Sequence, residues 1–521
     1  MLFNSYIFIF VFLPVTFFVF LLLKKYKSQF VINIWLIAAS CFFYAWWNTP
    51  YILLLILSVL INFGIGALIN AQYDKPSVRK KILIFGITCN LGVLCYYKYA
   101  GFLVNIVNDI AATQFKLGTI FLPLAISFFT LQQISYLVDA YRGRASEFNF
   151  LSYAASVTFF PHLIAGPIVR YRDLVPQFSG TKAQAFNSLD VAVGLTLFFM
   201  GLFKKIILAD HISRYVDSPF AAAAAGAPVT CLEAWSACIG FVLQLYFDFS
   251  AYSDMAIGLG RIFGIRLPVN FNSPLKAVNF IDFWHRWHIT LSQFIRDYLF
   301  FPLARKFRGP GSQYYITLVV MVLVGLWHGA GWTFPLWGAV HGTLLIINNL
   351  WRGMRRRWGH NFARPTWYGS AGARLLTWFF LVVSIPLFRA VDFPAALAML
   401  KGMLGSNGML LSQQFLEFWG LQAWIPLLTG WGFQVGDLNL LKGGVLEWLV
   451  LGLLIVNFFP NTQEILSKFD PCLGFNLGEA AGTWKWLRWR PTAPWAFLTG
   501  CLALASLLLS AKENPFLYFQ F

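Results

Sequence analysis

Residues 278–303 read VNFIDFWHRWHITLSQFIRDYLFFPL, and this stretch constrains the fold more than any other. Its apolar residues recur with a helical period, which predicts a helix. The same stretch carries the ionisable residues Asp282, His285, Arg286, His288, Arg296 and Asp297. In a membrane protein, a charge facing lipid at the bilayer centre costs roughly 2.5–3.5 kcal/mol. We therefore expect a helix packed within the protein, or a re-entrant helix that lines a wet cavity.

Spacing within this predicted helix indicates which side chains meet. Asp282 and Arg286 are four residues apart and can form an ion pair. His288 and Ser292 have the same spacing, as do Ser292 and Arg296. His285 and His288 are three apart, which places them on roughly one face. The alternative is a cytoplasmic interfacial helix whose charges are simply solvated.

The composition places the chain in a membrane. Of its 521 residues, 58% are hydrophobic and only 12% are charged, whereas a soluble domain carries roughly 25% charged residues. The net charge is +18. The basic residues gather in short gaps between apolar runs, as they do in cytoplasmic loops, so we read them as orientation signals and expect no nucleic-acid partner.

Since a span needs roughly 20 residues, we expect about 11 true membrane spans among the apolar runs, with two or three further runs re-entrant or interfacial. The first covers residues 5–23 and is followed by Lys24, Lys25 and Lys27, which predicts an uncleaved span with the N-terminus outside. Lys204–Lys205 and Arg352 to Arg357 are among the basic gaps. Residues 410–444 predict an extracytoplasmic loop with interfacial helices. No soluble appendage is evident, so we expect a single membrane domain over residues 1–521.

A second polar site lies in residues 321–342, which read MVLVGLWHGAGWTFPLWGAVHG. Basic clusters flank the two apolar runs on their outer ends, which predicts a hairpin whose tip points away from the cytoplasm. A helix from Tyr314 to His328 is about 21 Å long, so His328 should lie deep in the membrane. An intramembrane histidine is a functional candidate, although a structural histidine bonded to a carbonyl is an equal alternative. For His341 we favour the structural role.

The remaining polar positions are weaker candidates. Asp248 and Asp254 interrupt an apolar helix and favour buried packing or cavity groups over a catalytic pair. The glycines of residues 258–264 lack the strand and the Lys-Ser/Thr of a phosphate loop. His162 suits a tight re-entrant turn, whereas His211 and His360 are expected to be solvated. Neither the histidines nor the seven cysteines have metal-ligand spacing, so we expect no metal.

Several of these segments together carry a resemblance to a known family. They are FPHLIAGPIVRY at 160–171, YFDFSAYSDMAIG at 246–258, PVNFNSP at 268–274, residues 282–303 and 325–342 quoted above, and the tail PFLYFQF at 515–521. The chain resembles the membrane-bound O-acyltransferase (MBOAT) family, specifically its bacterial branch for polysaccharide O-acetylation of the alginate type. Two departures are slight: His285 stands where relatives often have Arg, and Ala251 where Gly is common.

The resemblance implies an all-α polytopic membrane fold with re-entrant and interfacial helices around a central tunnel. It implies that His328 and His288 meet at the centre of that tunnel as catalytic residues, with His328 as general base and His288 positioning the donor or binding the oxyanion. As further tunnel or substrate-binding residues we name Asp282, His285, Arg286, Ser292, Arg296, Trp327 and Asp254.

The implied reaction transfers an acetyl group from a cytoplasmic thioester, acetyl-CoA or another acyl thioester, to a hydroxyl that arrives from outside. No cofactor is expected to be bound. A separate extracytoplasmic acetyltransferase would relay the group onto an exported polysaccharide, in a complex of the bacterial inner membrane. Three alternatives stay open: a subunit for teichoic-acid D-alanylation, a transporter, and a non-catalytic scaffold of a polymer-export complex. The sequence does not distinguish alginate from cellulose.

Overall fold

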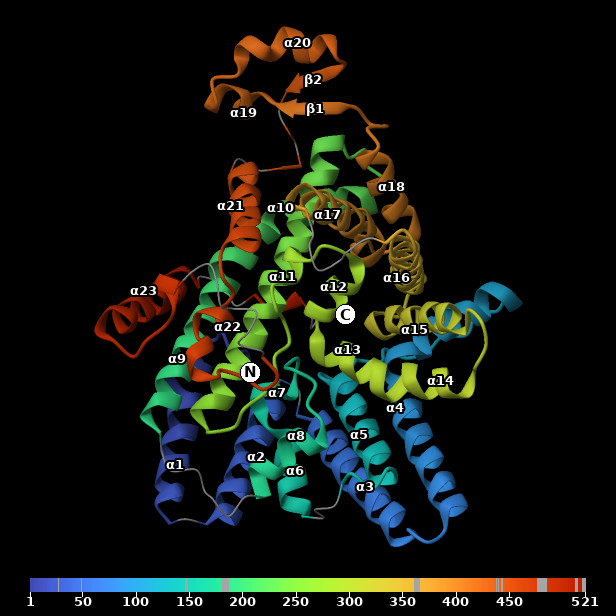
Figure 1. Ribbon diagram of the computed structural model, residues 1–521, viewed down its shortest axis with the longest axis vertical. Coiled ribbons are helices and arrows are strands. Elements are labelled where there is room, and N and C mark those ends of the chain that lie inside the picture. Colours follow the sequence, from blue (N-terminus) through green and yellow to red (C-terminus); the bar gives the residue numbers. More distant parts are fainter. Residues whose placement is uncertain are drawn as a thin grey trace.

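The computed structural model is built almost entirely of helices (Figure 1). It describes residues 1–26, 28–47, 49–145, 149–179, 187–359, 366–436, 438, 440–441, 444–475, 485–510 and 514–517. His360, Lys27 and residues 518–521 of the tail motif lie outside the described residues. The all-α membrane fold expected from the sequence is confirmed. One small addition is a two-stranded parallel sheet of β1 (Met409–Ser412) and β2 (Phe433–Gly436).

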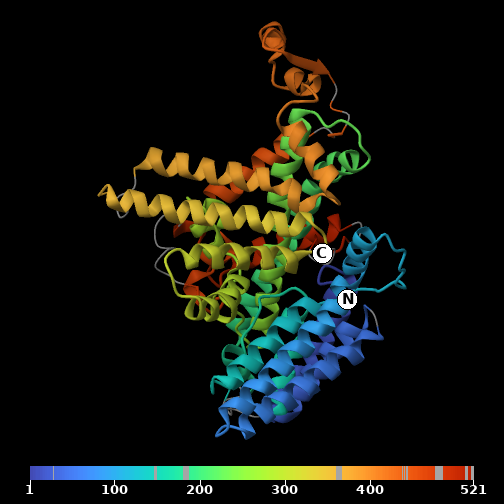
Figure 2. The same ribbon diagram turned by 90° about the vertical axis from the view of Figure 1, so that its right-hand side faces the viewer.

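The N-terminal helices form a bundle at one end of the molecule (Figures 1 and 2). They are η1 (Phe8–Phe12), α1 (Leu13–Lys25), α2 (Gln29–Ala45), α3 (Tyr51–Ala71), α4 (Pro76–Ala111) and α5 (Ile126–Tyr141). Asn62 of α3 and Asn90 of α4 exchange side-chain hydrogen bonds of 3.2 and 2.7 Å. Such a reciprocal amide pair satisfies two polar groups that would otherwise be costly between apolar helices.

The centre of the molecule is a packed pair of long helical segments. Helices α6 (Phe150–Thr158), α7 (Phe160–Leu163) and α8 (Tyr171–Ser179) lead to α9 (Ser188–Phe203), η2 (Lys204–Ala209), α10 (Asp210–Ala224) and α11 (Cys231–Ile262). Gly194 of α9 and Gly258 of α11 face each other so closely that a Cβ on either would lie 2.5 Å from the other's carbonyl oxygen. Small residues thus let the two backbones touch, as is common where helices associate in membranes.

Lys204 and Lys205 overturn one expectation from the sequence. They do not form a cytoplasmic gap, because residues 188–224 run as one continuous helical stretch. Their charges are neutralised within the protein: Lys205 Nζ lies 2.7 Å from Asp248 of α11 and 2.8 Å from Asp210, and Lys204 Nζ lies 2.5 Å from Asp254. Asp248 and Asp254 are both 2% exposed, which confirms that they are buried packing groups. The lysines occupy a π-helical turn, a local widening that often marks special sites.

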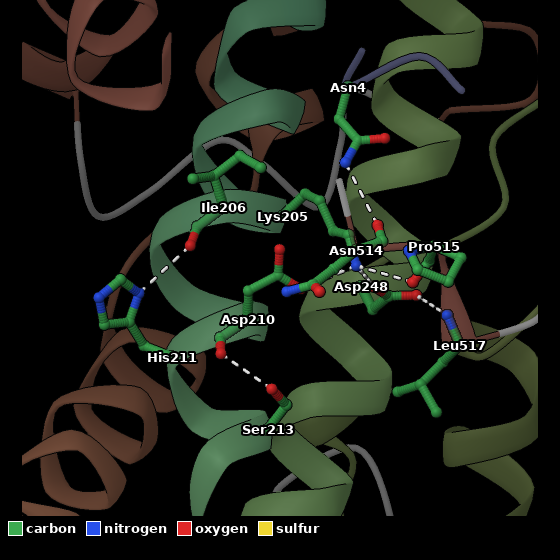
Figure 3. A network of polar contacts seen from close by, with 10 residues as sticks. All are labelled: Asn4, Lys205, Ile206, Asp210, His211, Ser213, Asp248, Asn514, Pro515 and Leu517. Atoms are coloured by element: carbon green, nitrogen blue, oxygen red, sulfur yellow. Dashed lines mark hydrogen bonds and ion pairs between the residues drawn. The ribbon is translucent and has the colours of Figure 1, made fainter. Parts of the chain in front are cut away.

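The chain's C-terminal segment completes this buried network (Figure 3). Lys205 Nζ donates to Pro515 O at 3.3 Å, and Leu517 N donates to the second carboxylate oxygen of Asp248 at 2.9 Å. The ring of Phe516 packs 4.8 Å from the Lys205 ammonium. The tail thus joins η2 to α11, which gives the tail motif a structural role.

Residues 274–306 form several short helices where one was predicted. They are η3 (Pro274–Lys276), α12 (Phe280–Arg286), α13 (Ile289–Ile295), η4 (Arg296–Phe300) and α14 (Phe301–Lys306). The prediction of one continuous helix is wrong, because the backbone at His288 has a φ of +42° and interrupts the helix between α12 and α13. The break sends His285 outward, where it is exposed, while His288 is buried. The two histidines therefore do not share a face.

The predicted hairpin is confirmed. Helices α15 (Ser312–His328) and α16 (Thr333–Arg357) are joined by a short turn, and α17 (Trp367–Arg389) packs beside them (Figure 2). Gly325 and Gly338 lie where the two arms touch, and a Cβ on either would clash with the backbone of the other arm. These two glycines allow the arms to close at the tip, next to His328.

The remaining elements lie towards the opposite end from the N-terminal bundle or beside α9. They are α18 (Phe393–Met403), α19 (Gln413–Phe418), η5 (Gln422–Trp424), α20 (Ile425–Gly430), α21 (Val445–Phe458), α22 (Thr462–Ile465), η6 (Ser467–Phe469), η8 (Lys485–Leu487) and α23 (Ala493–Leu509). β1, α19, α20 and β2 project from the end of the molecule (Figure 1). The helices expected in this region are present.

Ten apolar helical stretches in the described residues are candidates for the expected spans. Five have the length and composition to cross a membrane: Phe8–Lys25, Tyr51–Ala71, Pro76–Ala111, Ser188–Ala224 and Trp367–Arg389. Five shorter ones of 10–17 residues are Gln29–Ala45, Ser312–His328, Phe393–Met403, Val445–Phe458 and Ala493–Leu509. The number of about 11 true spans stays a prediction.

Candidate functional site

Two cavities meet at His328. The first, which we call the histidine cavity, spans about 620 Å³ of empty space, open solvent included, and is lined by His288, His328 and His341 together with apolar and aromatic side chains of α11, α12, α16 and α17. The second, which we call the lysine cavity, spans about 680 Å³ of empty space, open solvent included, and is lined by Lys98, Trp47, the chain at 122–128, Ile164, Trp327 and His328. His328 lines both cavities. Since it is only 6% exposed, it forms part of the wall between them.

The hairpin tip positions the His328 ring. His328 is the last residue of α15, so its side chain sits where the helix gives way to the turn. Its ring packs nearly perpendicular to Trp337 of α16, with centroids 5.4 Å apart, and 5.2 Å from Phe388 of α17. Three elements thus enclose the imidazole, which limits the orientations it can adopt.

Helix α4 holds the end of α15. The last carbonyls of a helix have no partner within the helix and carry partial negative charge. Here Tyr99 Oη donates to Leu326 O at 2.7 Å, and Lys98 Nζ donates to Trp327 O at 2.5 Å and to His328 O at 3.2 Å. A cation and a hydroxyl from one turn of α4 therefore fix the backbone that carries His328.

His288 is positioned by the break between α12 and α13. Its side chain is 1% exposed and packs edge-on against Phe249 of α11, with centroids 4.8 Å apart. Its Nδ1 lies 3.1 Å from Asn270 Oδ1. That oxygen also accepts from Thr290 Oγ1 at 2.8 Å and Thr290 N at 3.4 Å, so it is an acceptor and His288 Nδ1 carries the proton. In the neutral ring, Nε2 is then the basic nitrogen.

Trp327 lies between the two histidines. Its ring centroid is 6.2 Å from that of His288 and 4.9 Å from that of His328. The structure therefore brings together three residues that the sequence named as site candidates, in one buried cluster that borders both cavities. Two imidazoles of this kind, beside space for ligands on either side, can exchange protons with a reacting hydroxyl or thiol.

The other predicted tunnel residues lie elsewhere. Asp282 and Arg286 pair at 2.7 Å as expected, and both are about a quarter exposed. Arg296 is more than half exposed and pairs with Asp297 at 2.8 Å. Asp254 is bound by Lys204, Thr462 and Gln463. None of these, nor His285 and Ser292, lines either of the two cavities in the part of the chain that the structure describes.

His341 makes the structural contact that the sequence favoured and also lines the histidine cavity. It is 1% exposed and lines the histidine cavity, with its ring 4.4 Å from that of Trp337. It also makes a structural contact, from Nε2 to Ser384 Oγ at 3.1 Å. One nitrogen is thus structural, as expected, but the ring also belongs to the cavity wall.

Sequence reasoning missed Lys98, Tyr99, Asn270 and Trp284. Lys98 is a single lysine within an apolar helix, and such a residue is itself a signal of function. Asn270 lies in the quoted segment 268–274 but was given no role. His162 is buried, and its ring contacts Gln132 Nε2 at 3.2 Å and Ser156 O at 2.9 Å, so it has a structural role. Among the described residues no group of His, Cys, Asp and Glu could hold a metal ion.

Comparison with known proteins gives a consistent picture. The model of the MBOAT, membrane-bound O-acyltransferase, family matches residues 141–388, a range that contains His288 and His328. The chain is 40% identical over 448 residues to the peptidoglycan O-acetyltransferase of Helicobacter pylori, covering 80% of this chain and 83% of that protein. It is 35% identical over 561 residues to the probable alginate O-acetylase AlgI of Pseudomonas aeruginosa, covering all of both chains. A teichoic acid D-alanyltransferase of Streptococcus thermophilus is more distant, at 27% identity over 48% of this chain.

Proposed function

Because this chain belongs to the membrane-bound O-acyltransferase family, we propose that it passes an acetyl group from a cytoplasmic thioester to a hydroxyl, for the O-acetylation of an exported polysaccharide. It is a multi-pass membrane enzyme, an O-acyltransferase. The single observation that carries the reaction mechanism is that His328 lines two cavities at once. One residue in the wall between two ligand spaces is where a donor from one side and an acceptor from the other would meet.

The two cavities differ in a way that supports assigning them to the two substrates. The lysine cavity includes Trp47 at the end of α2, Lys98 and the chain at 122–126, which lie away from the basic clusters at Lys24–Lys25 and Arg142–Arg144. By the positive-inside rule it faces the extracytoplasmic side. The histidine cavity includes residues of α12, which follows Lys276 and ends at the basic residue Arg286. We therefore assign the donor to the histidine cavity and the acceptor hydroxyl to the lysine cavity.

His328 is our candidate general base. As the hydroxyl oxygen attacks the thioester carbonyl carbon, the imidazole takes the hydroxyl proton and a new C–O bond forms. The C–S bond then breaks, and the departing thiolate receives the proton back from the imidazolium. A neutral imidazole can accept the proton and return it within one catalytic cycle, which suits this exchange. General-base assistance of this kind contributes typically 10²–10⁴ in rate.

His288 takes the role of positioning the donor. Asn270 accepts the Nδ1 proton of His288, so a neutral His288 offers an acceptor nitrogen to the cavity and no N–H. This favours donor positioning over the alternative of oxyanion binding, which would need a protonated ring. Asn270 acts through His288 and is therefore a positioning residue.

The wider setting is part of the same proposal. Donors would be acetyl-CoA or another acyl thioester. We place the protein in a bacterial inner membrane with its N-terminus outside, and we expect an extracytoplasmic acetyltransferase to receive the group and transfer it onto the polymer. The names of the relatives, one acting on peptidoglycan and one on alginate, support a polysaccharide as the final acceptor.

The test measures acetyl transfer itself. Inside-out membrane vesicles from cells producing the polymer receive acetyl-CoA labelled in the acetyl group. We expect label to appear as base-labile ester on the polymer, and vesicles from a deletion strain to show none. A transporter or scaffold would leave the polymer unlabelled, or labelled equally without this chain, and either result would overturn the proposal.

A further inference from the structure

The end of α16 carries positive charge that the protein does not neutralise. Residues 298–391 contain ten arginines and lysines but no aspartate or glutamate. Four of the ten, Arg352, Arg355, Arg356 and Arg357, lie in the last two turns of α16. In the part of the chain that the structure describes, Arg352, Arg356 and Arg357 form no ion pair. Their charge is therefore available to an anionic group from outside the chain.

These arginines lie at the free end of a pair of helices. The ring of Trp337 in α16 packs 5.0 Å from that of Phe388 in α17, and His341, four residues later, contacts Ser384, four residues earlier. The two helices are therefore antiparallel, and the same register places the end of α16 level with the start of α17. Figure 2 shows the pair projecting from the body of the molecule. The free end, which we call the arginine arm, comprises residues 351–358 and 367–374.

Exposed aromatic rings accompany the arginines in the arm. Trp351 and Trp358 are 46% and 69% exposed, with ring centroids 5.8 Å apart, and Trp367 and Tyr368 are 82% and 64% exposed. Tryptophan and tyrosine favour the level of the lipid headgroups in a membrane, because each ring has an apolar body and a polar N–H or O–H. The arm thus combines cations with side chains that prefer the headgroup level.

An apolar surface on the same two helices adjoins the arm. Ile347 and Leu350 precede the arm on α16, Leu375 and Leu376 follow it on α17, and all four side chains are exposed. A soluble acidic protein could neutralise the arginines, but it would leave this apolar surface uncovered. One phospholipid molecule satisfies both, because its phosphate lies at the level of the arginines while its acyl chains lie along the apolar side chains.

We propose that the arginine arm binds anionic phospholipids, with its arginines donating to the phosphate oxygens and the acyl chains lying along the adjoining apolar side chains. Guanidinium groups suit this ligand, because their paired N–H donors match two oxygens of one phosphate. The headgroup must carry a net negative charge, since the choline of a zwitterionic lipid would place another cation beside the arginines. The arm lines neither the histidine cavity nor the lysine cavity, so this site is separate from the proposed acyl transfer.

The test compares the binding of two lipids to the purified protein in detergent. Native mass spectrometry counts bound phosphatidylglycerol and phosphatidylcholine with identical acyl chains. We expect wild type to bind phosphatidylglycerol at least tenfold more tightly than phosphatidylcholine. A triple variant with Arg352→Gln, Arg356→Gln and Arg357→Gln should bind the two lipids about equally, because each cation near an anionic membrane surface strengthens binding roughly fivefold. The ratio of the two lipids is measured within one preparation, so a less stable variant still gives a valid result.

A matched variant with Lys75→Gln, Lys80→Gln and Lys81→Gln removes the same charge from another exposed basic cluster, where α4 begins, and should keep the wild-type preference. Inorganic phosphate, compared with sodium chloride at equal ionic strength, distinguishes a free phosphate from a headgroup and should not displace phosphatidylglycerol. Equal binding of the two lipids by wild type, an equal loss in both triple variants, or displacement by millimolar phosphate would each overturn the inference. Equal lipid binding by a wild-type protein that retains polyglutamate would show that the arm binds an acidic protein instead.

Discussion

At the scale of single residues, the backbone that carries His328 depends on α4. The three last carbonyls of α15 accept from Tyr99 and Lys98, which lie more than two hundred residues away in the sequence. Catalytic groups act only within narrow limits of position, and a displacement of about 1 Å can cost 10²-fold in rate. We regard Tyr99 and Lys98 as positioning residues for His328.

Tyr99→Phe tests this contact, because it removes one hydroxyl and keeps the ring. We expect acetyl transfer to fall roughly tenfold, since the last turn of α15 loses a fixed point, with nearly unchanged protein in the membrane. Tyr96→Phe is the matched control, because Tyr96 is 57% exposed on the same helix. Equal activity of the two variants in the vesicle assay would show that α4 does not position the site.

At the scale of elements, the joint between η2 and α11 stabilises the centre of the fold. Lys205 and Asp248 are each 2% exposed and 2.7 Å apart, and the tail residues Pro515 and Leu517 complete their hydrogen bonding. α11 carries Phe249, which packs on His288, directly after Asp248. Asp248, which belongs to the network in Figure 3, is therefore the direct sequence neighbour of a residue that lines the histidine cavity.

Asp248→Ala should be strongly destabilising, because it leaves the Lys205 charge buried with one carboxylate fewer. Removing one partner of a buried pair costs about 3–5 kcal/mol. The thermal unfolding of purified protein in detergent measures the effect. Asp470→Asn is the control, since its pair with Arg266 is exposed and such pairs contribute about 0–1 kcal/mol. A melting temperature of Asp248→Ala equal to that of the control would contradict the role of the joint.

The sequence predicted those elements whose signals are local. Apolar run length predicted the α15–α16 hairpin, and the i, i+4 spacing predicted the Asp282–Arg286 pair. The depth of His328 in the membrane stays a prediction. The predictions failed where contacts between residues far apart in the sequence determine the structure. Lys204 and Lys205 resembled a loop because their partners Asp254 and Asp248 are over forty residues away, and the break at His288 is held by Asn270. The sequence around His341 did not predict that this residue lines a cavity, because the cavity forms only when α12, α16 and α17 pack together.

At the scale of the whole molecule, the account requires the two cavities to open towards opposite sides of the membrane. The N-terminus supports this arrangement, because the Met1 amino group lies 3.4 Å from Phe43 O near the end of α2, whereas Lys24 and Lys25 lie at the far end of α1. Trp47, in the wall of the lysine cavity, follows the same end of α2. The N-terminus and the lysine cavity are therefore at the same end of α2.

Cysteine labelling in intact cells tests this orientation in a cysteine-free background. We expect a membrane-impermeant thiol reagent to label a cysteine at position 117, in the segment between α4 and α5, and to leave a cysteine at position 356, at the end of α16, unlabelled until the cells are opened. The basic cluster at the end of α16 predicts its cytoplasmic location. Labelling of position 356 from outside would reverse the assignment of the two cavities.

The central claim is that His328, in the wall between the two cavities, takes the proton of the acceptor hydroxyl. The most direct test is ester acetate on the secreted polymer per amount of membrane protein, for wild type, His328→Ala, His328→Gln and the control His211→Ala, whose ring packs on Trp448 outside both cavities. The account predicts that both His328 variants accumulate normally and lose at least 10²-fold in acetylation, because glutamine cannot accept the proton at neutral pH, while His211→Ala retains it. Full acetylation by a well-accumulated His328→Ala protein would contradict it.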